Sequence, residues 1–175
     1  MILILSGSLH PTSRSRVLAK HCRQILSDHS IANDYFDLAE TPLPPCDGAA
    51  AYGDPAVVDL AQRIGESAGV IIASPVYNYD VNAAVKNAVE LTGRAWTDKV
   101  VGLMLAAGGA GSYMSAMGLA SSLMLDFRCL IIPRFVYATG EHFEGDAVAD
   151  DEIDRRVKRL CEDMRKLSSA MTPRD

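Results

Sequence analysis

The sequence predicts a doubly wound α/β fold, in which five parallel strands form one sheet with helices on both of its faces. Short apolar runs of strand length alternate with segments whose apolar residues recur at helical spacing. The runs are apolar throughout, a pattern typical of parallel strands that are covered on both faces. Parallel strands in turn need crossover helices. At 175 residues the chain is expected to form a single domain over residues 1–175.

Four of the five expected strands are strongly apolar, and the second is a weaker candidate. The predicted strands cover residues 2–5, 35–38, 69–73, 99–107 and 129–136. We expect Ser74-Pro75 to end the third strand, because proline lacks the N–H that a sheet needs. Gly108-Gly109 is expected to end the fourth.

Helices are expected between these strands and after the last one. Leu18, Cys22, Ile25 and Leu26 repeat at helical spacing, and Asp54-Pro55 is a typical helix start with an N-cap and a proline in the first turn. Either Asp80 or Asn82 is expected to cap the third helix. The predicted helices cover residues 15–28, 55–67, 83–92, 112–126 and 150–169, and the Pro- and Gly-rich residues 40–55 are expected to form a loop.

The natural arrangement of such elements is the flavodoxin-like strand order 2-1-3-4-5. Ligands of doubly wound sheets lie beyond the carboxyl ends of the strands, at the point where the winding reverses. For this order the reversal falls between strands 1 and 3. The loops that follow those two strands are therefore the first places to look for a site.

Composition and charge disfavour several classes of partner. The net charge is −5 and no basic stripe is present, which argues against nucleic acid. The apolar opening, MILIL, is too short for a signal peptide or a membrane-spanning helix, so no membrane partner is expected. The four cysteines are far apart and show no metal-ligand spacing, which predicts reduced thiols in a cytoplasmic protein.

The loop after the first strand is rich in hydrogen-bond donors. Ser8, Ser13 and Ser15 supply hydroxyl groups and Arg14 supplies a guanidinium, just where the first helix begins. Unpaired N–H groups at a helix N-terminus already favour an anion. The alternative is that Ser13 only caps the helix and that the other hydroxyls face water. The position at the winding reversal favours a phosphate site.

The absence of two sequence motifs indicates which kind of phosphate group the loop would bind. The loop has neither the GxxxxGK[ST] pattern of nucleoside triphosphate sites nor the GxGxxG pattern of pyrophosphate sites. A monophosphate ester fits best, and flavin mononucleotide (FMN) is the common cofactor that carries one. The chain also lacks GxSxG, which argues against a small α/β hydrolase.

Two further loops are expected to adjoin this one. After the third strand, Tyr77 and Tyr79 supply flat surfaces and Asn78 supplies a donor and an acceptor. After the fourth, a glycine-rich turn can adopt positive φ and allow close approach to its backbone. That turn contains Gly108, Gly109 and Gly111. Three suitable loops on adjoining strand ends predict a single pocket.

These motifs resemble those of the NADPH-dependent FMN reductase family. Residues 7–15 match the spacing of its GSxRxxSxS motif, with His10 where relatives commonly carry Arg. A second motif, P-x-Y-N followed by G-x-x-K-N, is matched except that Ala83 replaces the glycine. Its matching residues are Pro75, Tyr77, Asn78, Lys86 and Asn87. The resemblance spans roughly residues 1–140.

The resemblance implies a site for FMN with two parts. The phosphate would be bound by Ser8, Ser13, Arg14 and Ser15. The isoalloxazine ring would lie against the loops after the third and fourth strands, which contain Pro75, Val76, Tyr77 and Asn78, and Gly108, Gly109, Gly111 and Ser112. No catalytic acid or base is assigned, because orientation and electrostatics are the protein's part in such chemistry.

The resemblance also implies an activity and partners. NADPH, or NADH, would donate hydride to FMN, which would reduce a free flavin, quinone, azo compound or metal oxyanion. Relatives are usually homodimers or homotetramers, and some supply a partner monooxygenase. Met and Leu side chains on more than one face of helix 112–126 fit a subunit contact. Two alternatives stay open: a flavodoxin that carries single electrons, and a non-enzymatic flavin-binding module.

Overall fold

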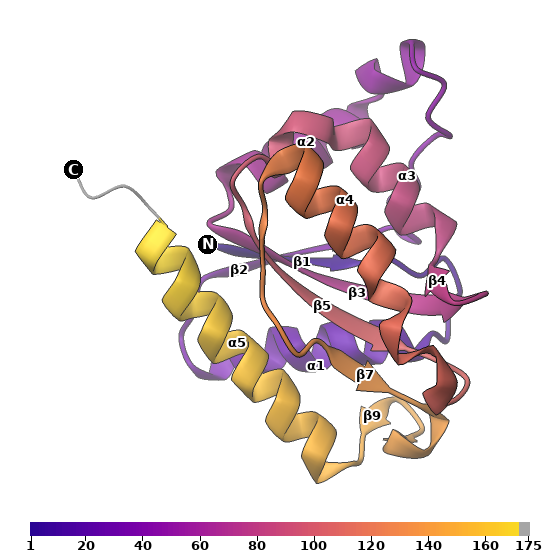
Figure 1. The fold of residues 1–175 in the computed structure, drawn as a ribbon, viewed down its shortest axis with the longest axis vertical. Coiled ribbons are helices and arrows are strands. Elements are labelled where there is room, and N and C mark those ends of the chain that lie inside the picture. The colour runs from indigo at the N-terminus through magenta and orange to yellow at the C-terminus, as the bar shows by residue number, and fades with distance from the viewer. Residues whose placement is uncertain (172–175) are drawn as a thin grey trace.

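A parallel sheet runs through the computed structural model, which describes residues 1–171 (Figure 1). The strands lie in the order β2-β1-β3-β5, and β5 then pairs with β6 and with β7. Their bounds are β1 (Ile2–Ser6), β2 (Asn33–Asp37), β3 (Gly69–Tyr77), β5 (Val100–Ala106), β6 (Leu130–Ile131) and β7 (Val136–Ala138). This confirms the predicted flavodoxin-like order 2-1-3-4-5, with β5 as the fourth predicted strand and β6 and β7 together as the fifth.

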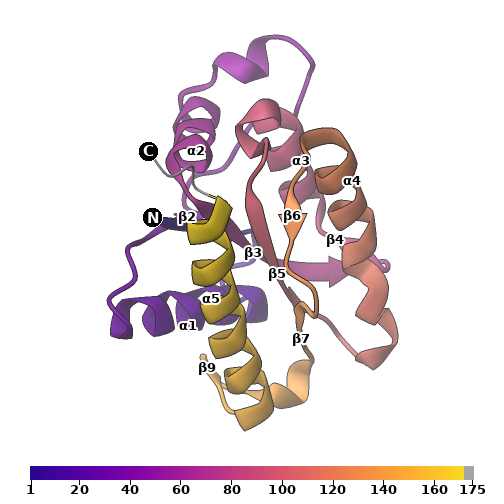
Figure 2. The same cartoon turned by 60° about the vertical axis from the view of Figure 1, so that its left-hand side comes forward.

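Helices cover both faces of the sheet, as predicted (Figure 2). The α-helices are α1 (Arg14–Asp28), α2 (Pro55–Glu66), α3 (Ala83–Thr92), α4 (Met117–Phe127) and α5 (Asp151–Met171). Alternate residues of β1 enter two different apolar cores: Leu3 and Leu5 pack with α2, α3 and α4, whereas Ile2 and Ile4 pack with α1 and α5. A strand buried on both faces must be apolar at every position, which explains the continuous apolar runs.

Helix starts follow the expected capping chemistry. The Asp54 carboxylate accepts a hydrogen bond from the N–H of Ala56, and Pro55 occupies the first turn of α2. The cap of α3 is Asn82 rather than Asp80, with its side-chain oxygen 3.4 Å from the N–H of Val85. The predicted helix 112–126 begins as a 3-10 helix, η3 (Ala110–Ala116), and becomes α-helical only at Met117.

The expectation that Pro75 ends the third strand is wrong. β3 continues through Pro75 to Tyr77, and Pro75 lies opposite Ala106 of β5. β1 pairs with β3 only as far as Ala73, and the short strand that follows β3 pairs with it only at Val76 and Tyr77, so neither of these strands pairs with Pro75. A proline is tolerated there because no ladder hydrogen bond is lost.

The predicted strand 129–136 is also interrupted. It is divided into β6 and β7 by a segment that contains Pro133 and Arg134, and Arg134 has a φ of 60°. A signal of this break was present in the sequence, because Pro133-Arg134 interrupts the apolar run. Between β7 and α5 the chain forms two elements that the sequence did not predict: the 3-10 turn η4 (Gly140–His142) and a hairpin of β8 (Phe143–Glu144) and β9 (Ala147–Val148).

The remaining short elements are local turns. Residues 40–55 form the predicted loop with one 3-10 turn in it, η1 (Ala50–Gly53), and η2 (Gly93–Trp96) follows α3. β4 (Asp80–Val81) folds back on the end of β3. No helix within residues 1–171 is both long enough and apolar enough to cross a membrane.

Asn82 fastens the ends of β1 and β3 to α3. Its side-chain amide donates to the carbonyl of Gly7 at 2.7 Å, and its side-chain oxygen accepts from the hydroxyl of Ser74 at 3.1 Å. A Cβ at Gly7 would stand 2.2 Å from a methyl of Val85, so the chain after β1 can approach α3 this closely only as glycine. The loop after β1 is thus held from one side by α3.

We predict that Asn82→Ala lowers the free energy of unfolding by about 1–3 kcal/mol, because it leaves the buried Gly7 carbonyl without its donor and removes the cap of α3. The measurement is urea unfolding followed by the fluorescence of Trp96, the only tryptophan, which is fully buried. Asn82→Ser retains a capping oxygen and is expected to lose less. Equal stability of N82S and the unmodified protein would show that the Gly7 hydrogen bond contributes nothing.

Candidate functional site

The structure brings three loops together at the carboxyl ends of β1, β3 and β5. They surround a pocket of about 330 Å³, a size at the lower end of small-molecule sites. Many of the sequence-predicted residues line it, together with His10, Thr12, Ala106 and Ala107. The predicted residues among the lining are Ser13, Arg14, Ser15, Pro75, Val76, Tyr77 and Gly108.

Ser13 and Ser15 place two hydroxyl groups side by side at the start of α1. Their Oγ atoms lie 2.8 Å apart, and both side chains are buried. Ser13 has the extended backbone of an N-cap (φ −80°, ψ 132°), yet its side chain makes no capping hydrogen bond. The N–H groups of the first turn therefore lack the serine partner that usually satisfies them. This argues against the alternative in which Ser13 serves only as a cap.

Arg14 is the exposed cation of this pocket. Among residues 1–171, no hydrogen bond or ion pair holds its guanidinium. Ser8, by contrast, does not line the pocket. Its side chain is buried and its hydroxyl accepts a hydrogen bond from the N–H of His10 at 3.2 Å, so it stabilises the turn of the loop from within.

Arg16 is the residue of this loop that sequence reasoning missed. It is buried, and its guanidinium pairs with Asp37 at the end of β2, with Nε 2.6 Å from one carboxylate oxygen and Nη2 3.0 Å from the other. The same guanidinium donates to the backbone carbonyls of Ser8, His10 and Pro11 at 2.6–3.0 Å. One signal was available: Arg16 follows Ser13 by three residues on a helix, and an aspartate ends the neighbouring strand.

The ion pair keeps Asp37 charged. Burial by itself would raise the pKa of Asp37, but hydrogen bonds from Arg16 and from the N–H of Ala39 outweigh it and hold that pKa below its usual value. The hydrogen bond to Asp37 in turn raises the pKa of Arg16. Tyr35, whose hydroxyl lies 3.3 Å from Asp37, is half-buried, and burial raises its pKa to about 12. The group under the loop is thus one fixed cation and one fixed anion.

The second loop is a tight hairpin between β3 and β4. Asn78 and Tyr79 form its two-residue turn, with φ values of 51° and 65°. This is the pattern of a type I′ turn, in which the second position is usually glycine. Tyr77 and Tyr79 are more than half exposed. Asn78 does not line the pocket; it makes the turn that carries the two tyrosines.

The third loop follows β5. None of Gly108, Gly109 and Gly111 adopts positive φ, so that part of the expectation is wrong. The expected open approach does exist, because a Cβ at any of the three would meet nothing within 4 Å. Tyr137 of β7 donates a hydrogen bond to the carbonyl of Gly109, which ties this loop to the sheet.

Ser112 lies outside the pocket lining and has non-helical backbone angles inside η3. The next residue, Tyr113, stacks on Phe135 with ring centroids 4.8 Å apart and meets Tyr137 edge-on at 5.5 Å. These aromatic contacts hold the end of the third loop. Of the three predicted glycines, Gly108 lines the pocket, whereas Gly109 and Gly111 do not.

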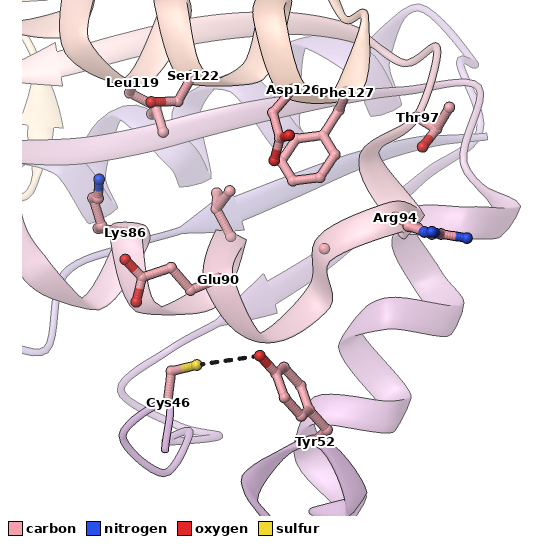
Figure 3. Close-up of a pocket in the computed structure, with 12 residues that line it drawn as sticks. Cys46, Tyr52, Lys86, Glu90, Arg94, Thr97, Leu119, Ser122, Asp126 and Phe127 are labelled. Carbon is pink, nitrogen blue, oxygen red and sulfur yellow. Dashed lines mark hydrogen bonds between the residues drawn. The ribbon is translucent and has the colours of Figure 1, made fainter. Parts of the chain in front are cut away.

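A larger pocket of about 920 Å³ lies elsewhere, between α3, α4 and the segment that holds Cys46 and Tyr52 (Figure 3). It shares no lining residue with the smaller one. Lys86 of the second motif lines this larger pocket. Asn87 instead bonds the backbone of Pro44 and Cys46, at 2.9 and 2.8 Å, and holds that segment in place. The larger pocket also contains hydroxyl groups and a guanidinium, those of Thr97, Ser122 and Arg94, but no α-helix begins among its lining residues.

We predict that Asp37→Asn lowers the free energy of unfolding by about 3–5 kcal/mol near neutral pH, because it leaves the Arg16 charge buried without a counter-charge. The pKa of Asp37 is depressed in the folded state, so the contribution of its charge is present at higher pH and is lost as acid protonates the group. The difference between the two proteins, measured by urea unfolding, should therefore shrink below about pH 4.

The matched control is Asp34→Asn on the same strand. Asp34 pairs with Arg63, which is more than one-third exposed, and exposed pairs contribute about 0–1 kcal/mol. A loss for D37N no larger than that for D34N, or a difference that does not change with pH, would contradict the role assigned to the buried pair.

Comparisons with known proteins identify the family of this chain. The family described as NADPH-dependent FMN reductase matches residues 1–144. A NADPH:quinone oxidoreductase from Arabidopsis thaliana is 28% identical over 170 residues, covering 91% of this chain and 87% of the relative. A NADPH azoreductase from Bacillus sp. (strain OY1-2) is 26% identical and covers 94% and 88%.

Among solved structures, the flavoenzyme NAD(P)H:(acceptor) oxidoreductase FerB from Paracoccus denitrificans superposes with a TM-score of 0.79. The two are 19% identical, and 97% of each chain is covered. At that identity the superposition establishes the shared fold alone. The family match covers most of this chain and includes the three loops that meet at the pocket, so the protein belongs to the NADPH-dependent FMN reductase family.

Proposed function

We propose that this protein binds FMN in the pocket at the ends of β1, β3 and β5, and uses NADPH or NADH to reduce a small acceptor through it. The observation that carries the proposal is the set of unused donors at the start of α1. Ser13 leaves the first turn uncapped, and Arg14 has no partner among the described residues. Donors without partners at a helix N-terminus are what an anionic group needs.

The residues present fit FMN in chemistry and in placement. Ser13, Arg14, Ser15 and the N–H groups of the first turn of α1 would hold the phosphate. The ring would lie against the walls formed by the other two loops, where the glycines leave room for a flat ring to approach the backbone. Those walls contain Pro75, Val76, Tyr77 and Gly108. The other predicted residues do not line the pocket and would instead shape its three loops; they are Ser8, Asn78, Gly109, Gly111 and Ser112.

When bound, FMN supplies hydride acceptance from NAD(P)H and electron delivery to the acceptor. The chain's own part is to orient and to exclude water. Backbone N–H groups around Gly109–Gly111 would favour negative charge at the ring. Tyr77 offers a flat exposed surface at the pocket, with Tyr79 exposed two residues further along the chain. No residue of the pocket needs to act as a proton donor or base.

The test of the proposed function is the visible spectrum of the protein with FMN, recorded before and after anaerobic addition of NADPH. Bleaching of the flavin bands, followed by their return when a quinone is added, is expected. A flavin-binding protein that NADPH does not bleach would instead be a flavodoxin-like electron carrier. Protein that does not bind added FMN would be a non-enzymatic module, and the proposal would fail.

We predict that Arg14→Ala weakens FMN binding by about 1–3 kcal/mol, the contribution of a charge-assisted hydrogen bond to phosphate. Affinity for riboflavin, which lacks the phosphate, should not change. Quenching of flavin fluorescence on titration with protein measures both. Unchanged FMN affinity in R14A would remove Arg14 from the site.

We predict that Tyr79→Gly stabilises the fold but raises the KM for a quinone. A non-glycine residue in the left-handed region costs about 1 kcal/mol, and Asn-Gly is the favoured sequence for this turn. Thermal unfolding should therefore occur at higher temperature in the variant. Because an exposed aromatic side chain is removed from the turn next to Tyr77, which lines the pocket, the KM for a quinone should rise. A lower unfolding temperature with unchanged KM would contradict both parts.

We further propose that the protein works as a homodimer or homotetramer. The start of α4 and the turn before it expose Tyr113, Met114 and Met117, and the end of α4 exposes Met124 and Leu125, with Leu125 82% exposed. Apolar patches of this kind mark contacts between subunits. Leu125→Arg is expected to reduce the mass measured by light scattering. The control Val58→Arg, at an exposed position on α2, is expected to leave it unchanged.

The remaining assignments are also proposals. We place the whole chain, as one domain, in the cytoplasm, in line with its four unpaired cysteines. A free flavin, quinone, azo compound or metal oxyanion is the proposed acceptor class. If reduced flavin leaves the protein, a partner monooxygenase would receive it.

A further inference from the structure

Arg14 rests against a glycine from a distant part of the chain. Gly140 is the first residue of η4, which follows β7. A Cβ at Gly140 would stand 2.8 Å from Nη1 of Arg14, 3.1 Å from Cζ and 3.2 Å from Nη2. Nearly equal distances to three atoms place that Cβ over the face of the guanidinium rather than at its edge. The Arg14 guanidinium therefore occupies the space that a side chain at Gly140 would need.

The backbone of this turn does not itself require glycine. Gly140 is not among the residues with positive φ. The turn is held at both ends: the N–H of Thr139 donates to Nδ1 of His142 at 2.9 Å, and the N–H of His142 donates to the carbonyl of Thr139 at 3.1 Å. Alanine would fit this backbone. Only the contact with Arg14 explains what glycine provides here.

Seating the guanidinium in this way has a consequence for binding. A long arginine side chain loses rotamer freedom when it grips a ligand, and the loss is smaller when the guanidinium is already held flat. Contact with Gly140 on the face leaves the N–H groups at the edge available. Arg14 has no other partner among residues 1–171, so those donors are unoccupied at the pocket.

We propose that Gly140 is a positioning residue, which holds the Arg14 guanidinium for the ligand's phosphate and so sets the preference for FMN over riboflavin. This inference rests on the proposed function of the pocket. It adds the turn after β7 to the site, although no residue of that turn lines the pocket.

The test is a double-mutant cycle of Gly140→Ala and Arg14→Ala, with the affinities for FMN and riboflavin measured by fluorescence quenching. G140A should weaken FMN binding by about tenfold, within the range of one charge-assisted hydrogen bond. Riboflavin binding should not change. In the R14A background, Gly140→Ala should have no further effect. Thermal stability should be retained, because the added methyl would displace only the end of the Arg14 side chain and no backbone atom is among its nearest neighbours.

Gly65→Ala is the matched control, because a Cβ there meets nothing within 4 Å. It should leave both affinities unchanged. Equal weakening of FMN and riboflavin in G140A would overturn the inference, as would additive effects of the two substitutions or unchanged FMN affinity. Each of these outcomes would show that Gly140 does not act on phosphate binding through Arg14.

Inorganic phosphate separates this inference from the proposed function. If the unmodified protein binds no FMN, the proposed function fails. Thermal stabilisation by phosphate that is present in the unmodified protein and in G65A, but reduced in G140A and R14A, would still support the seating of Arg14. Equal stabilisation of all four proteins, or none in any, would overturn it in that case.

Discussion

The site depends on one buried ion pair, Arg16 with Asp37. The loop after β1 has no regular backbone hydrogen bonding of its own, so its carbonyl groups need donors. Arg16 supplies them to three successive parts of the loop while Asp37 balances its charge. Because Asp37 ends β2 and β2 pairs with β1 in register from Ile2 to Ser6, the carboxylate lies directly beside the loop. The pairing of β1 with β2 thus fixes the position of Asp37, and through Arg16 the conformation of the loop.

Two arginines in this loop have opposite roles, although they are two residues apart. Arg16 lies on the buried side of α1, and its donors are used by Asp37 and by carbonyl groups. Arg14 lies on the exposed side, rests on Gly140 and keeps its donors available. Residues two positions apart in an α-helix, such as Arg14 and Arg16, point about 200° apart around the helix axis. A structural cation and a ligand-facing cation can therefore sit in one short segment without competing.

Chemistry rather than size identifies the site. The larger pocket between α3 and α4 mixes charged, polar and apolar groups, but no α-helix begins in it. The smaller pocket gathers the start of α1, two adjacent hydroxyls, a free guanidinium and a bare glycine backbone. Its walls come from strands that end at different lengths: β3 continues past the last pair with β1, which places Pro75 and Val76 beside the loop instead of beneath it.

By itself the sequence determined the features that arise from neighbouring residues. Continuous apolar runs and helical spacing predicted the strands, the helices and their order, and Asp54-Pro55 predicted the start of α2. The three loops of the site followed from that order, because parallel strands end at one edge of a sheet.

Only the tertiary structure decided what depends on distant contacts. Pro75 stays within β3 because its neighbour strand stops short, and the break at Pro133 separates β6 from β7. The separate roles of Arg14 and Arg16 were set by Gly140 and Asp37, which the fold brings to them from the turn after β7 and from the end of β2. Periodicity reports whether a residue is buried, but it cannot report which distant residue it meets.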